Sequence, residues 1–304
     1  MSCSICSSTS VRVQKPYLAK SPFFIGKSIT KCDICGMQFA CPMPSNKDWE
    51  EYNSSYFLSA HGGVNSSHQF EFFSVGLAKV RFRAVAEFAA VNNISLNTIL
   101  EVGPGAGYLA REILTYFPNV TYYVVETDRV VHQKLNEIGT HIICEKDINK
   151  VGPIDFMIAT HVLEHTLKPI EFLNYYSEPV RCGGGVFVEV PCLDHLYKKI
   201  YEPHVQFFEK ETLEVCFNRI GLKNIQLTYN GDKVRFIRIF SFLRKLLAKL
   251  ESLTGFPFHW FVVKYWPNTK RFSLLKSEAL AILETAPHVQ QDSYARWLRG
   301  FGLK

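Results

Sequence analysis

The chain has 304 residues, of which 47% are hydrophobic and 20% are charged, a globular composition that excludes a disordered or fibrous protein. This length predicts one main domain with small appendages. The net charge of +6 comes from the tail, where residues 223–304 hold 14 Lys/Arg and 5 Asp/Glu, so the rest of the chain is not basic enough to indicate a nucleic-acid-binding surface.

The first ten residues, MSCSICSSTS, lack the basic and apolar stretches of a secretory signal. The sequence also contains no apolar run of the roughly 18 residues needed to span a bilayer. We therefore expect a cytoplasmic protein. Because cytoplasmic thiols stay reduced, we do not expect the nine cysteines to form a disulfide framework.

Four cysteines form two C-x2-C pairs near the amino terminus: Cys3 with Cys6, and Cys32 with Cys35. Paired C-x2-C sequences supply the four thiolates of a tetrahedral zinc site. Such a site leaves no position for water, so we predict a structural zinc whose binding drives folding of the module. Cys41 is an alternative ligand, although a lone cysteine before a proline more often only fills space.

The amino-terminal module is predicted to end in a short helix. Residues 46–60 begin with an asparagine cap and have a helical pattern, and a Gly/Ser/Asn linker follows at 61–67. We therefore assign the zinc-binding module and its linker helix to residues 1–60. A longer helix is predicted over 69–92 from apolar residues near 3.6-residue spacing.

Strand-like and helix-like stretches then alternate along the chain. Strands are predicted at 97–102, 120–126, 140–144, 154–159, 184–190 and 222–229, and helices near 107–117, 129–138, 168–181 and 209–220. This alternation is typical of an α/β fold with a Rossmann-like, doubly wound, mostly parallel sheet. Ligands of such sheets bind at the carboxyl ends of the strands.

The last part of the chain carries a basic amphipathic segment at 234–252. It predicts either a helix in peripheral contact with a membrane or a lid or dimerisation helix. A final strand is predicted at 260–265 and one or two helices at 272–300. The main domain is thus assigned to 69–265 and a helical extension to 266–304.

The segment NTILEVGPGAGYL joins an apolar strand to a helix through three glycines, Gly103, Gly105 and Gly107. They permit a tight turn and close approach of backbone amides to a ligand. Glu101, on the strand before them, would repel a pyrophosphate but attract the ammonium and sulfonium groups of S-adenosylmethionine. Glu126 ends the next strand, where an acidic side chain can accept hydrogen bonds from ribose hydroxyls.

These motifs together resemble those of the class I S-adenosylmethionine-dependent methyltransferases over about residues 70–230. The resemblance implies that Asp147 and Ile148, in KDI, hold adenine. IDFMIATHVLEH is similar to the fourth strand and its following loop, which makes His161 a further candidate cofactor contact. RCGGGVFVEVP is similar to the turn into the fifth strand, with Arg-Cys in place of the usual Lys-Pro, a departure that puts no chemistry in doubt.

The stretch CDICGMQFACPMPS, followed by YNSSYF, resembles the linkage ahead of many class I methyltransferases of sugar and polysaccharide gene sets. It is also similar to the sugar C-methyltransferases, which have an amino-terminal zinc-binding domain that helps to form the substrate cleft. The resemblance implies a nucleotide sugar or glycan as the acceptor. It makes Tyr52 and Tyr56 candidate substrate contacts, unless they only pack between the two domains.

Methyl transfer needs a base only if the acceptor loses a proton, and a histidine suits that role near neutral pH. His165 and His204 follow the fourth and fifth strands, at the predicted cleft. The sequence around His204 resembles the H-x-x-x-F-x-x-x-x-L segment of zinc-domain sugar methyltransferases, whose C-methylating members use a Tyr, a Glu and a His together. Tyr201 and His204 match this set, but Pro203 replaces the Glu, so we favour an oxygen acceptor over carbon.

Two other functions fit parts of the sequence. Zinc modules also precede some rRNA methyltransferases, but residues 1–60 lack a dense basic patch interleaved with aromatic residues. A zinc module joined to a degenerate Rossmann-like domain could instead serve as a non-catalytic assembly protein. The intact glycines and acidic residues of the predicted cofactor site argue against such degeneracy.

Overall fold

The computed structural model describes residues 2–53, 68–233, 237–256, 258 and 295–304. Its strands are β1 (Val11–Pro16), β2 (Ser28–Cys32), β3 (Gln38–Cys41), β4 (Thr98–Val102), β5 (Thr121–Val125), β6 (His141–Ile142), β7 (Ile154–Thr160), β8 (Val180–Pro191), β9 (Gln206–Phe207), β10 (Lys223–Lys233) and β11 (Ala295–Leu303). Its α-helices are α1 (Asn46–Asn53), α3 (His68–Val91), α4 (Tyr108–Tyr116), α5 (His132–Ile138), α6 (Pro169–Ser177), α7 (Lys210–Arg219) and α8 (Ile237–Thr254).

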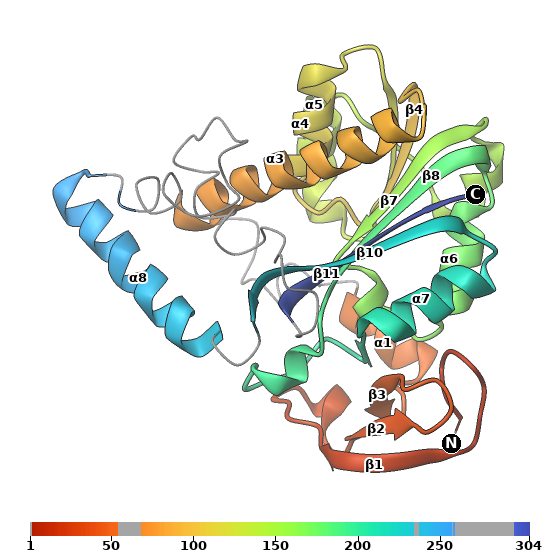
Figure 1. The fold of residues 1–304 in the computed structure, drawn as a ribbon, viewed down its shortest axis with the longest axis vertical. Helices are drawn as coiled ribbons and strands as arrows, with labels where there is room; N and C mark the ends of the chain where they lie inside the picture. Colours follow the sequence, from red (N-terminus) through yellow and green to blue (C-terminus); the bar gives the residue numbers. More distant parts are fainter. Residues whose placement is uncertain (1, 54–67, 234–236, 257, 259–294) are drawn as a thin grey trace.

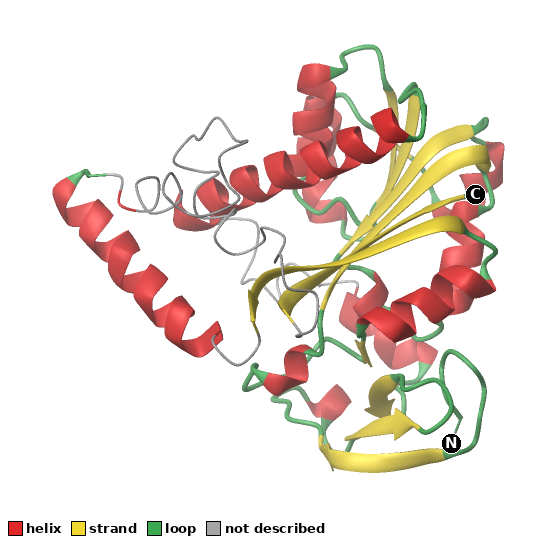
Figure 2. Cartoon of the chain, viewed as in Figure 1, coloured by secondary structure: helices red, strands yellow, loops and turns green. Residues whose placement is uncertain are grey.

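The larger sheet has seven strands in the order β10-β11-β8-β7-β4-β5-β6. Figure 2 shows this sheet in yellow among red helices. The strands from β8 to β6 are parallel, whereas β11 runs antiparallel to both β8 and β10. All seven residues of β7 are buried, as expected for a central strand that needs cover on both faces. The predicted Rossmann-like, mostly parallel sheet is confirmed.

Helices cover both faces of this sheet (Figure 1). On one face, Phe82 and Phe88 of α3 share a core with residues of α4, α5 and the sheet, including Phe156 of β7. On the other face, Leu173 of α6 and Phe217 of α7 pack in a second core. This layering directs the carboxyl ends of the parallel strands toward one edge of the domain, where a doubly wound sheet binds its ligands.

A smaller sheet of four strands, in the order β1-β2-β3-β9, forms the amino-terminal module. Three of its strands come from the first 41 residues, but β9 comes from the loop that follows β8. Phe39 of β3 pairs with Gln206 of β9, and the Ala40 amide donates to the Val205 carbonyl at 2.8 Å. The module is therefore joined to the main domain by a shared sheet.

Two predicted elements are wrong in part. The helix predicted over 168–181 ends at Ser177, and β8 begins at Val180. Residues 295–300, predicted as helix, belong to β11 in the main sheet, so the helical extension assigned to 266–304 is wrong at its end. The sequence pattern of a strand is weak here because β11 pairs with strands that are far away in sequence. It also carries Gly300 and Gly302, because a Cβ at either position would meet side chains at about 2.9 Å. The strand predicted at 260–265 and the helices over 272–294 lie outside the described residues.

Candidate active site

A cavity of about 1200 Å³ lies at the carboxyl ends of the parallel strands. The turn after β4, the loops after β5, β7 and β8, and helix α3 all contribute to its lining. Aromatic side chains reach it from three more distant elements: Trp49 of α1, Phe242 of α8 and Trp297 of β11. A concave site with apolar walls and a few convergent polar groups is typical of a ligand-binding site.

The three glycines after β4 all have positive φ angles: +66° at Gly103, +55° at Gly105 and +73° at Gly107, a conformation that other residues adopt at a cost. Gly103 and Gly105 line the cavity, as predicted. Gly107 does not, and a Cβ there would lie 2.7 Å from the Ile138 side chain. The structure therefore gives Gly107 a packing role, which lets α4 approach α5.

Glu101 is buried on β4 and lines the cavity. It accepts a hydrogen bond of 2.8 Å from the Tyr122 hydroxyl. Burial raises the pKa of Glu101 to about 7, against the opposing effects of Tyr122 and Arg81, while Glu126 raises it further. A buried carboxyl group of this kind is stabilised in its ionised form by a cationic ligand.

Glu126 lies directly after β5 and also lines the cavity. Its carboxylate accepts hydrogen bonds from the Gly105 amide at 3.1 Å and from the Asp128 amide at 2.9 Å. Burial raises the pKa of Glu126 although these amides lower it. The structure thus brings together Glu101, the first glycines and Glu126, at the strand ends where the sequence predicts them.

The predicted adenine contacts lie elsewhere. Asp147 is on an exposed 3-10 turn, Glu145–Lys150, where its Oδ1 lies 2.6 Å from Nζ of Lys150. Ile148 is fully buried. Neither residue lines the cavity, whereas Glu145 of the same turn does.

His165 and His204 meet on the cavity wall with their ring centroids 4.8 Å apart. Nδ1 of His204 lies 2.6 Å from Oδ2 of Asp194, and its Nε2 lies 4.0 Å from Oε1 of Glu164. Nε2 of His165 lies 3.8 Å from the same Glu164 oxygen. Glu164, His165 and His204 offer ligand atoms within 4.8 Å of one another, a geometry that could also hold a metal ion.

Electrostatics separates the roles of these groups. Burial would raise the pKa of Glu164, but its hydrogen bond with His161 and the nearby His165 and His204 bring it to about 2, so Glu164 is ionised at neutral pH. Burial lowers the pKa of His165 to about 3, with a smaller contribution from His204, so its ring is neutral. Burial also opposes ionisation of Asp194, yet His204 and Lys198 hold its pKa below the usual value.

His161 lies in a second buried ionic cluster at the cavity. Its Nε2 lies 3.3 Å from Oε1 of Glu189, and its Nδ1 is 3.2 Å from Oε1 of Glu164. Glu189 also pairs with Arg81 of α3 and Arg299 of β11, each at 2.5 Å. Glu189 of β8 thus connects α3 and β11 through ion pairs. Its contact with His161 gives that histidine a structural role in addition to the predicted cofactor contact.

Tyr201 does not reach the cavity. It is buried between the module and the main domain, with its ring 5.5 Å from Tyr17 and 6.2 Å from Phe207. The predicted catalytic role of Tyr201 is therefore wrong, because its side chain does not line the cavity. Tyr197 of the same loop lines it instead. Tyr52 likewise packs on Trp49 and Phe24, whereas Tyr56 lies outside the described residues.

The four predicted zinc ligands come together in the module. Cys3, Cys6, Cys32 and Cys35 have their Sγ atoms within 4.8 Å of one another. The Sγ atoms of Cys3 and Cys35 are 3.4 Å apart, and those of Cys6 and Cys32 are 3.5 Å apart. These distances are too long for a disulfide bond. They are close to the separation of about 3.8 Å between two sulfur atoms that are bound to one tetrahedral zinc ion at about 2.3 Å. Cys41 is not in this group.

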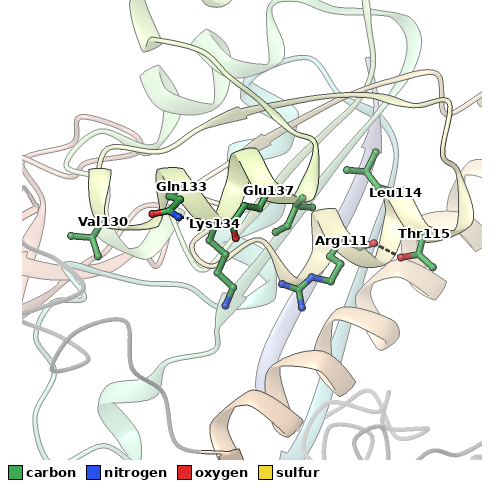
Figure 3. A pocket seen from close by; sticks show the side chains of 8 residues that line it. Arg111, Leu114, Thr115, Val130, Gln133, Lys134 and Glu137 are labelled. Atoms are coloured by element: carbon green, nitrogen blue, oxygen red, sulfur yellow. Dashed lines mark hydrogen bonds between the residues drawn. The ribbon is translucent and has the colours of Figure 1, made fainter.

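A shallower depression lies between α4 and α5, away from these residues. Figure 3 shows Arg111, Thr115, Lys134 and Glu137 around it. None of the predicted site residues lines this depression. The candidate active site is therefore the cavity at the strand ends.

The sequence reasoning missed several residues of the site. Asp194 lies ten positions before His204 without a recognised motif, and only the fold of the loop between them makes them partners. Glu164 lies between two histidines in HVLEH, and nothing in that local pattern marks it as the carboxylate that both His165 and His204 approach. Trp297 was hidden because its strand was predicted as helix.

The sheet and the cavity at its strand ends define a Rossmann-like enzyme with a site for a small cofactor. Residues 76–227, half of the chain, match the family model for a methyltransferase domain. The chain therefore belongs to this family, and it is an S-adenosylmethionine-dependent methyltransferase. No curated protein is significantly similar to it.

Solved structures of methyltransferases resemble the chain at low identity. One is a SAM-dependent methyltransferase from Thermotoga maritima described as a possible histamine N-methyltransferase (12% identity, TM-score 0.47, covering 84% of this chain and 98% of that one). Another, from Archaeoglobus fulgidus, has 12% identity and a TM-score of 0.48 and covers 82% and 98%. Phosphoethanolamine N-methyltransferase 2 from Haemonchus contortus has 15% identity and a TM-score of 0.44 and covers 68% and 48%. The assignment of the chain rests on the family match.

Cofactor affinity is expected to fall at acidic pH through Glu101. Since its pKa is about 7 in the free protein and a cationic ligand favours the ionised form, binding below pH 7 must release a proton. Calorimetry at pH 6 is then expected to give about tenfold weaker binding of S-adenosylmethionine than at pH 8. Glu101→Gln should bind weakly with a flat profile, and a flat profile in the parent would contradict the assignment.

Proposed function

We propose that this methyltransferase acts on a hydroxyl oxygen of a nucleotide sugar or other glycan, with His204 as the general base. The observation that carries the proposal is the Asp194–His204 pair in the lining of the cavity that also contains Glu101 and Glu126. When bound, S-adenosylmethionine supplies the electrophilic methyl group on its sulfonium.

The chain's own residues divide the remaining work. In this proposal Glu101 attracts the ammonium group of the cofactor, and Glu126 accepts hydrogen bonds from its ribose. The apolar side chains of Trp49, Phe73 and Trp297 in the lining exclude water and hold the two reactants together, which are the main requirements of a methyl displacement.

For the proton, the geometry favours one tautomer of His204. With the Asp194 carboxylate at Nδ1, the ring proton is on Nδ1, so Nε2 carries the lone pair. Nε2 would then take the hydroxyl proton of the acceptor as its oxygen bonds the methyl carbon, while the bond between that carbon and the sulfonium sulfur breaks and the cofactor leaves as the neutral thioether S-adenosylhomocysteine.

Three basic residues support a phosphate-bearing acceptor. Lys198, Lys199 and Arg296 line the same cavity as His204, and Lys198 lies 2.7 Å from Asp194. Cationic side chains bind phosphate groups strongly where solvent is partly excluded. A nucleotide sugar bound here would place its phosphates among these residues and its sugar near His204.

The test is incubation of the protein with labelled S-adenosylmethionine and a panel of nucleotide sugars, with mass spectrometry of the products. We expect transfer of one methyl group to a sugar oxygen. Methylation of RNA with no methylation of any sugar would overturn the acceptor assignment, and a C-methylated sugar would overturn the choice of oxygen.

We also propose that Cys3, Cys6, Cys32 and Cys35 bind a structural zinc ion. The four thiols fit a closed tetrahedral site, and the buried apolar residues of the module belong to the same core as residues of the main domain. The reductively purified protein is expected to contain about one zinc per chain by metal analysis. Cys32→Ser should lose the metal and unfold at lower temperature, whereas Cys144→Ser, at an exposed cysteine, should not; a zinc-free folded parent would refute the proposal.

A further inference from the structure

Helix α8 exposes an apolar face. Six large apolar side chains recur along it at helical spacing and are between 38% and 74% exposed: Ile239, Phe242, Leu243, Leu246, Leu250 and Leu253. Figure 1 shows α8 standing apart from the main sheet. A contiguous exposed apolar face of this kind marks an interaction surface.

The composition of α8 is also strongly basic. Its 18 residues include Arg238, Arg244, Lys245 and Lys249 against a single acidic residue, Glu251. Two copies of α8 facing each other would bring these positive charges together, which is unfavourable. An anionic surface complements both properties, because it offers negative head groups above an apolar layer.

We propose that α8 binds the surface of an anionic lipid bilayer, with its apolar face at the boundary between head groups and acyl chains. Among the described residues, no helix is long and apolar enough to cross a membrane. The six exposed apolar residues named above recur at helical spacing along one side of α8, and a basic amphipathic helix lies in the plane of the interface.

The cavity is continuous with this surface. Phe242 belongs both to the apolar face of α8 and to the lining of the active-site cavity. Docking of α8 would therefore bring one wall of the cavity to the bilayer surface. This inference goes beyond the proposed function, because it concerns where the enzyme works and not which atom it methylates.

The experiment is co-sedimentation of the full chain with vesicles of phosphatidylcholine alone and of phosphatidylcholine mixed with phosphatidylserine. The parent is expected to bind the anionic vesicles at least about tenfold more tightly, with the difference decreasing as salt is added. The variant Leu246→Glu with Leu253→Glu should lower binding to the anionic vesicles by about tenfold or more. Neither residue lines the cavity.

A matched control is Val13→Glu with Val91→Glu, which changes two exposed apolar residues of β1 and α3 and should bind as the parent does. Circular dichroism melting of both double variants establishes that they are folded.

Absence of vesicle binding by the parent, or equal binding by the α8 variant, overturns the proposal. Self-association in sedimentation velocity that the α8 variant abolishes, without vesicle binding, would instead assign this face to a second copy of the chain. Since the assay contains neither cofactor nor acceptor, its outcome is independent of the proposed methyl transfer.

Discussion

Replacing His204 by alanine is expected to lower turnover by about a hundredfold or more while leaving the affinity for S-adenosylmethionine nearly unchanged. The reason is geometric: Nδ1 of His204 lies 2.6 Å from Asp194, whereas the two carboxylates assigned to the cofactor lie elsewhere, Glu101 on β4 and Glu126 directly after β5. Turnover with the identified acceptor and calorimetry with the cofactor measure the two effects separately.

Two comparisons make this prediction specific. Asp194→Asn should also lower turnover, because it removes the negative charge that favours proton uptake by His204. His165→Ala should have the smaller effect, since burial keeps the His165 ring neutral and its Nε2 lies 3.8 Å from the Glu164 carboxylate, farther than the 2.6 Å between His204 and Asp194. Near-parent turnover in His204→Ala with collapse in His165→Ala would transfer the role of base to His165.

A different outcome would reassign the whole cluster. If the parent contains a second metal ion beyond the cysteine site and His204→Ala loses it, then Glu164, His165 and His204 are metal ligands. Metal analysis of the purified variant distinguishes this from loss of a base, because a general base can be removed without any change in metal content.

Glu126→Ala is expected to weaken binding of S-adenosylmethionine by roughly thirtyfold to a hundredfold, which corresponds to about 2–3 kcal/mol for a charge-assisted hydrogen-bonded pair. The change removes the proposed ribose acceptor and also leaves the Gly105 and Asp128 amides without this carboxylate. Isothermal titration calorimetry measures the affinity directly.

The matched control is Glu137→Ala, which removes an exposed carboxylate of the neighbouring helix α5 whose partner is Gln133. It should bind the cofactor as the parent does. If Glu126→Ala also binds the cofactor as tightly as the parent, Glu126 does not hold the ribose, and its assignment as the ribose acceptor after β5 is incorrect. Binding is measured at a temperature where Glu126→Ala is folded, so that a lower melting temperature of the variant does not account for weaker binding.

Sequence reasoning succeeded where the signal is local. The strands around Glu101 and Glu126 have continuous apolar runs, and the glycines between them require positive φ angles, so pattern and spacing predicted both the sheet and its cofactor edge. The cluster of four cysteines was also predicted, because two short spacings bring four thiols together. Each of these features depends on residues that are close in sequence.

The errors concern partners that only the tertiary fold brings together. Tyr201 was given a catalytic role because, with His204, it matches the Tyr, Glu and His set of the zinc-domain sugar methyltransferases, yet its ring packs against Tyr17 of the module. Asp194 was overlooked because its partnership depends on the course of the loop after β8. In the same way, β11 lacks a strand-like alternation and is fixed by pairing with β8 and β10.

The pairing of β9 with β3 has a consequence for how the module can be studied. An unpaired strand at the edge of a sheet is a template for strands of other chains, which leads to aggregation. In the intact protein Gln206 and Phe207 cover part of that edge. A fragment that ends after α1 would expose the edge of β3, so even in the presence of zinc it is expected to associate with other copies of itself. Adding a peptide that contains Gln206 and Phe207 should suppress this association.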